Sequence, residues 1–220
     1  MLEAPDLDLS AGAEKAFREV VETRNPALLP ASAPRWVFLQ WLARQSWLLH
    51  GSQHGNLNEL RSAEKAYHQP DEFSNTRGVY AASDGLWAMM YALRGPQAQS
   101  QSDMGLRLRL PDGKWSGMRY FLSLAARNPA VSDASSLQAP GFVYVLRRTG
   151  FQPSPPYLHL GLGEVQEAHW VSSGPVRPLM SVPVSPDDFP LKVRLHDAET
   201  VRARAAADPW GFPWLAPEDA

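Results

Sequence analysis

Apolar residues at helical spacing dominate the first 45 residues of the chain. Phe17 and Val20 fall on one face of a segment that follows Ser10 and stops at the sequence RNP. A serine at that position can accept a hydrogen bond from the first turn of a helix. A second helix is expected from Ser32, with a proline in its first turn. Residues 1–45 are therefore predicted to be helical.

From residue 46 the pattern changes to short apolar runs separated by turn residues, which is typical of strands. The first two runs are SWLLHG and RGVYAAS, and Asp84 follows as the expected cap of the helix GLWAMMYAL. The runs GLRLRL and MRYFLSL flank the turn sequence PDGKWSG, so they are predicted to form a hairpin. The polar stretch GPQAQSQSD before this hairpin is predicted to be a loop or an edge.

Three more strands are expected at GFVYVLR, EAHWVSS and RPLMSVPV, before a final helix from about Ala198 to Ala207. The 20 prolines and 15 glycines fit many short strands joined by tight loops. Helices first and mostly antiparallel strands afterwards indicate an α+β fold. We expect one domain over residues 1–220, with an N-terminal helical segment (1–45), a core (46–195), and a C-terminal helix and arm (196–220).

Composition and charge exclude several classes of protein. With 21 basic and 23 acidic side chains, the net charge is −2, so the chain offers no general positive field for nucleic acid. The absence of cysteine removes disulfides, thiolate nucleophiles and cysteine-based zinc sites. The acidic N-terminus lacks the apolar core of a signal peptide, and no apolar run approaches the roughly 18 residues of a spanning helix. A cytoplasmic protein without a membrane partner is the expectation.

Common catalytic motifs are also missing. There is no phosphate-binding P-loop, no G-x-S-x-G elbow and no H-E-x-x-H helix, and GLGEVQ lacks the third glycine of a dinucleotide fingerprint. His50 and His54 have the spacing of helical metal ligands, but a glycine follows each of them, so no metal site is predicted. A hydrolase that uses His50 with Ser52 stays open as an alternative without a supporting signature.

One set of residues does carry a candidate chemistry. The first apolar run ends on His50-Gly51-Ser52, the next contains the sequence GVYAAS with Tyr80, and Tyr91 comes eleven residues later in the following helix. Near the end of the core, Glu167 precedes the sequence VRP by nine residues. In order and spacing, residues 47–185 resemble the catalytic domain of the diphtheria-toxin-like and poly(ADP-ribose)-polymerase-like ADP-ribosyltransferases, the H-Y-E type.

The resemblance implies a split, mostly antiparallel β-sheet core that binds NAD as a substrate in a cleft. In such a site His50 would hydrogen-bond a ribose hydroxyl, and Ser52 would assist on the same sugar. Gly51 would let its main chain approach the nicotinamide amide, and Tyr80 and Tyr91 would enclose the nicotinamide ring. The bond from nicotinamide to ribose would break through an oxocarbenium-like transition state, which needs orientation and charge stabilisation.

The late carboxylate is the part of the pattern with alternatives. By the resemblance, Glu167 would accept a hydrogen bond from the ribose 2′-hydroxyl and stabilise positive charge on the ring. In a strand, Glu167 and His169 share one face and Glu164 lies on the other, so His169 is a further candidate to line the site. The chain departs from the family at Ala81, where an aromatic residue is usual, and at Ala88, where a small polar residue is common.

Three functional hypotheses follow. The first is an NAD-dependent mono-ADP-ribosyltransferase or NAD glycohydrolase, toxin-like, whose acceptor (protein, nucleic acid or small molecule) is not specified by the sequence. The second is an inactive ADP-ribosyltransferase-fold protein that binds a nucleotide or a protein partner. The third is a protein-interaction domain with no cleft lined by His50 and the tyrosines. The aromatic C-terminal arm, DPWGFPWLAPEDA, is expected to pack on the body or on a second copy in a homodimer.

Overall fold

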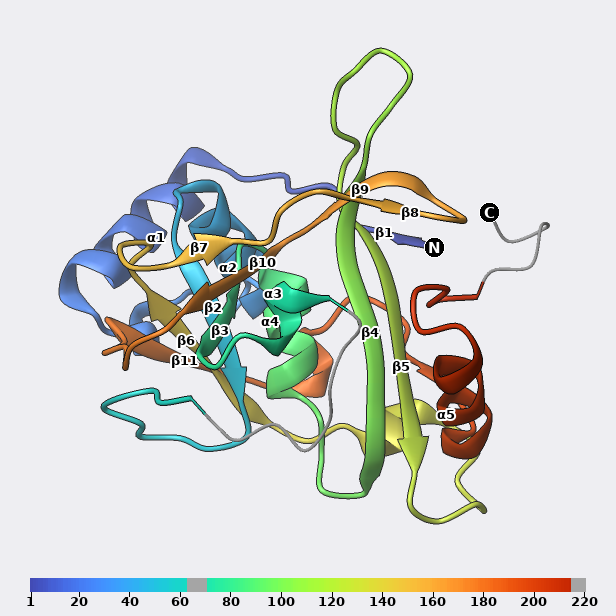
Figure 1. The fold of residues 1–220 in the computed structure, drawn as a ribbon. Helices are drawn as coiled ribbons and strands as arrows, with labels where there is room; N and C mark the ends of the chain where they lie inside the picture. Colours follow the sequence, from blue (N-terminus) through green and yellow to red (C-terminus); the bar gives the residue numbers. More distant parts are fainter. Residues whose placement is uncertain (63–70, 215–220) are drawn as a thin grey trace.

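The computed structural model describes residues 1–62 and 71–214 of the 220-residue chain. Two β-sheets lie side by side, and one short helix, α4, lies between them (Figure 1). The mixed α+β class predicted from the sequence is confirmed, with mainly antiparallel strand pairing in both sheets. None of the helices in the described part of the chain has the length and apolarity that a membrane crossing requires.

The first sheet contains the strands that carry the histidine and tyrosine of the predicted site. In spatial order it consists of β11 (Met180–Val184), β6 (Gly141–Leu146), β2 (Leu48–Ser52), β3 (Val79–Ala82), β10 (His169–Ser172) and β7 (Gln152–Pro153). All of these neighbours are antiparallel, and His50 pairs with Tyr144 across the β2–β6 register. The sequence His50-Gly51-Ser52 therefore forms the last three residues of an inner strand.

The second sheet is built around the long predicted hairpin. Its path runs through β1 (Leu2–Glu3), β5 (Arg119–Ala126), β4 (Ala98–Leu108), β9 (Gly163–Glu167) and β8 (Tyr157–His159), and β12 (Arg194–Leu195) pairs with β5 in parallel. The turn between β4 and β5 contains Gly113 at φ +80°, a conformation that glycine adopts without strain. This hairpin extends beyond the body of the molecule (Figure 1).

Four of the helices in the described residues lie close to where the sequence predicts; the one at Glu72–Asn75 was not predicted, and the prediction that residues 1–45 are helical is wrong at β1, which pairs with β5. The helices are α1 (Ala11–Thr23), α2 (Arg35–Arg44), α3 (Glu72–Asn75), α4 (Gly85–Ala92) and α5 (Ala198–Ala207), with short 3₁₀ turns at Pro26–Leu28, Ala134–Leu137 and Pro186–Asp188. The Ser10 hydroxyl accepts the Ala13 N–H and caps α1 as expected. The second helix starts three residues later than predicted, since Pro34 occupies the N-cap position and not the first turn.

Helix α4 is held by a buried capping carboxylate. Asp84 accepts hydrogen bonds from the Trp87 N–H at 2.8 Å, from the Tyr120 hydroxyl at 2.8 Å and from the Gln40 amide at 2.9 Å. Burial raises the pKa of Asp84, and these three bonds act in the opposite direction. Because α2, β5 and α4 all donate to one side chain, Asp84 fixes the start of α4 relative to both sheets.

The chain passes from one sheet to the other at Ala168. Its N–H donates to Gly105 of β4 at 3.0 Å, and its carbonyl accepts the Ser83 N–H after β3 at 2.8 Å. The sequence EAHWVSS was predicted to be one strand, and this is wrong: Glu167 ends β9 in the second sheet and His169 begins β10 in the first. The apolar pattern does not reveal such a residue, because the sequences before and after Ala168 are both typical of a strand.

The polar stretch predicted to be a loop is the first half of β4. Residues 98–104 pair with β5, and β9 pairs with β4 only from Leu106 onwards, so a loop is wrong from Ala98 and the alternative of an edge describes this part of the strand. Gln101, Ser102 and Asp103 give this part its polar character because they line a cavity and are not packed in the core. A strand whose outward residues face a cavity does not show an apolar face in sequence.

Candidate active site

A cavity of about 800 Å³ lies between the two sheets. Its size is within the range of cofactor and substrate sites, which is roughly 300–1,000 Å³. Six of the seven residues predicted from the sequence line it, namely His50, Gly51, Tyr80, Tyr91, Glu167 and His169. Ser52 is not among the lining residues, and its hydroxyl accepts the His54 N–H at 3.0 Å. The third hypothesis predicts no cleft lined by His50 and the tyrosines, and such a cleft is present.

His50 is held in one orientation by the neighbouring strand. Its Nδ1 lies 2.7 Å from the carbonyl oxygen of Tyr80. A carbonyl can only accept, so Nδ1 carries the proton and Nε2 of the neutral ring is left as an acceptor. Burial lowers the pKa of His50, while the bond to Tyr80 opposes that shift, and the net direction favours the neutral ring.

Tyr80 is fixed at its hydroxyl and packed among aromatic rings. The hydroxyl lies 2.9 Å from the Phe73 carbonyl and 2.6 Å from the Thr76 carbonyl, to which it can donate. Burial, with the charge of Asp71 as a second cause, raises the pKa of Tyr80 to about 12. The imidazole of His169 lies 4.9 Å from the Tyr80 ring centre at an angle of 42°. The Tyr80 side chain is thus a neutral, rigid wall of the cavity.

The Glu167 carboxylate is oriented by a tyrosine. The Tyr157 hydroxyl donates to Oε1 of Glu167 at 2.8 Å, and Nδ1 of His169 lies 3.7 Å from Oε2. Within the described residues, His169 Nδ1 has no hydrogen-bond partner although it is buried. Oε2 of Glu167, to which no described residue donates a hydrogen bond, therefore remains available to a ligand hydroxyl, whereas Nδ1 of His169 is buried from the cavity surface. Glu164, by contrast, points out of the cavity and lies 4.0 Å from the Arg109 side chain.

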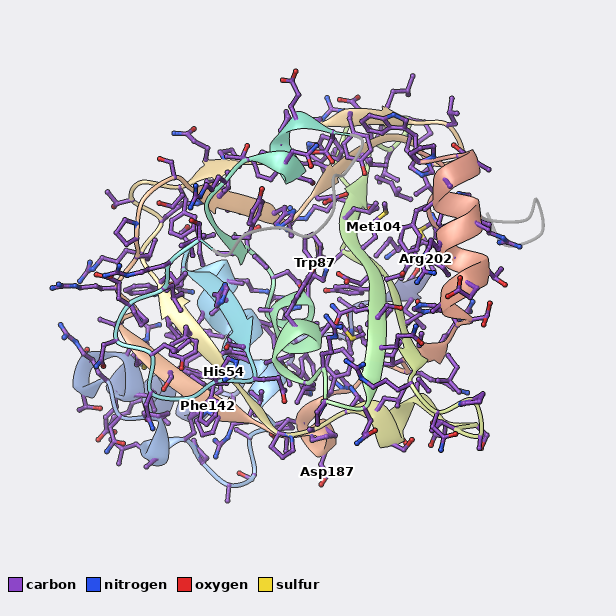
Figure 2. All side chains as sticks on the ribbon, turned by 60° about the horizontal axis from the view of Figure 1, so that its bottom comes forward. His54, Trp87, Met104, Phe142, Asp187 and Arg202 are labelled. Carbon is purple, nitrogen blue, oxygen red and sulfur yellow. The ribbon has the colours of Figure 1, made fainter. Side chains whose placement is uncertain are left out.

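The sequence did not identify Trp87 and Asp103, which complete the wall next to Tyr91. The Trp87 indole donates to Asp103 Oδ1, and the Gln101 amide donates to Oδ2 at 2.8 Å. Burial raises the pKa of Asp103, whereas hydrogen bonds from Trp87, Gln101 and Tyr91 lower it. Figure 2 shows Trp87 on α4 and Met104 on the facing strand β4. Of this wall, the sequence predicted only that Asp84 caps the helix that carries Trp87.

Gly51 allows α4 to cross β2 at close range. A Cβ atom at this position would lie 2.0 Å from the Ala88 carbonyl oxygen and 2.6 Å from the Ala92 nitrogen. Ala88, one of the two positions that depart from the family pattern, lies at this crossing and also lines the cavity. The packing supplies a reason for the glycine that is separate from the predicted contact with a nicotinamide amide. Tyr91, on the same helix, remains 46% exposed over the cavity.

The C-terminal arm packs against β8 and contributes residues to the cavity lining. The carbonyl of Phe212 accepts a hydrogen bond from His159 Nε2 at 2.7 Å, which anchors the arm to β8. Trp210 lies 6.2 Å from Tyr157, ring centre to ring centre, at 58°. We call the region lined by Asp71, Glu72, Tyr157, Trp210 and Trp214 the arm end of the cavity. Residues 215–220, which belong to the predicted arm, lie outside the described residues.

The charge of the cavity is negative. Four carboxylates line it, Asp71, Glu72, Asp103 and Glu167, and none of its lining residues in the described ranges is lysine or arginine. Arg147 and Arg148 lie outside the lining, and each faces an indole ring instead. The described residues also contain no cluster of three or more metal-ligating side chains.

Comparison with known proteins adds no relative: no family model, no curated protein and no solved structure matches the chain.

Proposed function

We propose that the protein cleaves NAD at the bond between nicotinamide and ribose and transfers the ADP-ribosyl group to an acceptor or to water. The observation that carries this proposal is that His50, Tyr80, Tyr91 and Glu167, from four separate segments, line a single cavity. The resemblance to the ADP-ribosyltransferases implies that these residues share one NAD site. Their presence in the lining of one cavity of suitable size supports a common ligand.

The geometry gives each residue a chemical task in this reaction. Nε2 of His50 would accept a hydrogen bond from a ribose hydroxyl, since Nδ1 is occupied by Tyr80. The carboxylate of Glu167, held by Tyr157, would accept the 2′-hydroxyl through Oε2. A carboxylate at that place stabilises the positive charge that develops on the ribose as the bond breaks. A cationic nicotinamide ring also fits a cavity lined by four carboxylates.

The aromatic wall would orient the nicotinamide ring. A ring that enters between Tyr80 and Tyr91 also meets His169, 4.9 Å from Tyr80, and Trp87, 6.4 Å from Tyr91. Flat faces on several sides restrict the ring to a few orientations, which lowers the entropic part of the barrier. Nicotinamide is neutral once it leaves, so it loses its electrostatic attraction to the carboxylates.

A second candidate is binding of a nucleotide without transfer. The departures from the family pattern at Ala81 and Ala88, which both line the cavity, favour this alternative. The absence of lysine and arginine from the described lining bears equally on both candidates, because each would have to hold phosphate groups that such side chains usually neutralise. The two candidates differ in one product. Both predict that NAD stabilises the folded protein, and only the enzyme releases nicotinamide.

The test is thermal unfolding with and without millimolar NAD, with nicotinamide followed by chromatography in the same samples. At 100 times Kd, ligand binding stabilises by about 2.7 kcal/mol, which raises Tm by about 5–10 °C for a chain of this size. The shift should disappear in His50→Ala and persist in His54→Ala, which removes a histidine outside the cavity lining. A shift without nicotinamide supports the binding-only candidate, and no shift in the wild type contradicts both.

A further inference from the structure

The arm end of the cavity has a chemistry of its own, separate from the residues assigned to NAD. We propose that it binds an organic cation, of the guanidinium type, carried by the second reactant. The identification of this cation as part of the acceptor rests on the proposed function, whereas the binding itself does not.

The aromatic rings of the arm end are inclined to one another and not stacked face to face. Tyr157 and Trp210 meet at 58°, and Phe212 and Trp214 meet at 89° with their centres 5.3 Å apart. Inclined rings leave parts of their faces uncovered, and Trp210 is 45% exposed. The face of an indole or phenol ring attracts a cation through its quadrupole, and guanidinium is favoured because it is flat and weakly hydrated.

Carboxylates line the same cavity as these rings. Asp71 is one of them, and its charge contributes to the raised pKa of both Tyr80 and Tyr157. Glu72 follows it in the chain and lines the same cavity. Glu167 lies beyond Tyr157, whose hydroxyl it accepts. A cation bound in this cavity therefore shares it with three carboxylates, of which Glu167 is joined to Tyr157 of the arm end.

Among the residues that the structure describes, no basic side chain pairs with Asp71 or Glu72. The Glu72 carboxylate accepts no hydrogen bond from any of these residues. Asp71 uses one oxygen to cap α3 through the Ser74 N–H at 2.6 Å. Acidic side chains gathered without a cation repel one another, so a bound cation lowers the energy of the site. An anionic or neutral ligand gains nothing comparable.

The test compares two probes of the same shape and different charge. Phenylguanidine is a cation at pH 7, and phenylurea is its neutral counterpart. Binding of each to the full chain, without NAD, is measured by calorimetry and by the change in tryptophan fluorescence. Phenylguanidine should bind at least about tenfold more tightly than phenylurea, because only the cation gains from the carboxylates and the ring faces.

The variants locate the binding within the arm end. Asp71→Asn keeps an N-cap residue, and Glu72→Gln keeps the shape of its side chain; each should weaken phenylguanidine about fivefold. Trp210→Leu, at an exposed position, should weaken it about threefold. Asp112→Asn removes one carboxylate at the tip of the β4–β5 hairpin, 3.3 Å from Lys114, and should change nothing. Melting curves confirm that each variant is folded.

Each outcome decides the proposal. Preference for phenylguanidine that is reduced in Asp71→Asn, Glu72→Gln and Trp210→Leu supports it. Equal affinity for the two probes, binding of neither, or binding that all three variants retain overturns it. Release of nicotinamide from NAD is measured separately, so an inactive protein that still prefers phenylguanidine refutes the enzyme and leaves the cation site standing.

Discussion

Substitution of Gly51 by alanine tests why a glycine follows His50. The new Cβ atom would lie 2.0 Å from the Ala88 carbonyl oxygen, and an ordinary contact is at least 3.4 Å. The other close atoms are the Ala92 nitrogen at 2.6 Å and the Tyr91 Cβ at 2.9 Å. Two of these three atoms belong to the backbone of α4, so no side-chain rotation relieves the contact. The helix or the strand has to move.

The expected cost follows from that displacement. Overpacking of a well-packed core costs about 1–3 kcal/mol, and a clash with backbone belongs at the upper end, so we expect about 3 kcal/mol. For a chain of this size, that loss lowers Tm by about 6–12 °C. The assay is thermal unfolding followed by circular dichroism, repeated in urea to obtain the free energy of unfolding.

Gly174→Ala is the matched control. No atom lies within 4 Å of its added Cβ, so we expect a change within about 0.5 kcal/mol. A Gly51→Ala protein that melts within about 2 °C of the wild type would refute the close crossing of α4 over β2. If it also lost stabilisation by NAD, the glycine would serve ligand approach alone, as the resemblance to the ADP-ribosyltransferases implies.

Three further predictions concern the groups around the cavity. Burial lowers the pKa of His50 from its ordinary value of 6.5. As the pH decreases from 7 to 5, the unfolded state therefore binds more protons at His50 than the folded state does, and the protein becomes less stable. His50→Asn should reduce this pH dependence of the free energy of unfolding, measured in urea at pH 7 and pH 5. Asp84→Ala should lower the free energy of unfolding by about 3 kcal/mol, because a helix cap is lost and buried donors lose their acceptor. Asp197→Ala, at the exposed cap of α5, should lower it by about 1 kcal/mol. Both are measured by urea unfolding, and equal losses would contradict the buried network. Tyr157→Phe should lower the free energy of unfolding by about 1 kcal/mol, because the hydrogen bond to Glu167 is lost. Since the Glu167 carboxylate is then no longer held in place, kcat for nicotinamide release should fall more than KM changes. An unchanged kcat would refute this positioning role of Tyr157.

The local features of the fold were predictable from sequence because they depend on neighbours along the chain. The Ser10 cap, the Asp84 cap, the hairpin around Gly113 and the limits of α5 are all present. Each of these signals is a short-range hydrogen bond or a backbone preference. The candidate site came from the resemblance in order and spacing to a known family, and six of its seven residues line one cavity, with Ser52 as the exception.

The features that sequence did not predict depend on contacts between distant segments. The first half of β4 looks like a loop because Gln101 and Asp103 face the cavity. The division between β9 and β10 depends on Ala168, which bonds to both sheets. The arm end is formed by packing of Trp210 against Tyr157, more than fifty residues earlier in the chain, and periodicity does not record such a contact.

The most direct test of the account is the rate of nicotinamide release from NAD by the wild type, Glu167→Gln and Glu164→Gln. The two glutamates lie on the same strand, but only Glu167 lines the cavity. We predict release by the wild type, a rate about a hundredfold or more lower in Glu167→Gln, and an unchanged rate in Glu164→Gln. No release by the folded wild type, or equal rates in all three proteins, would contradict the proposed reaction.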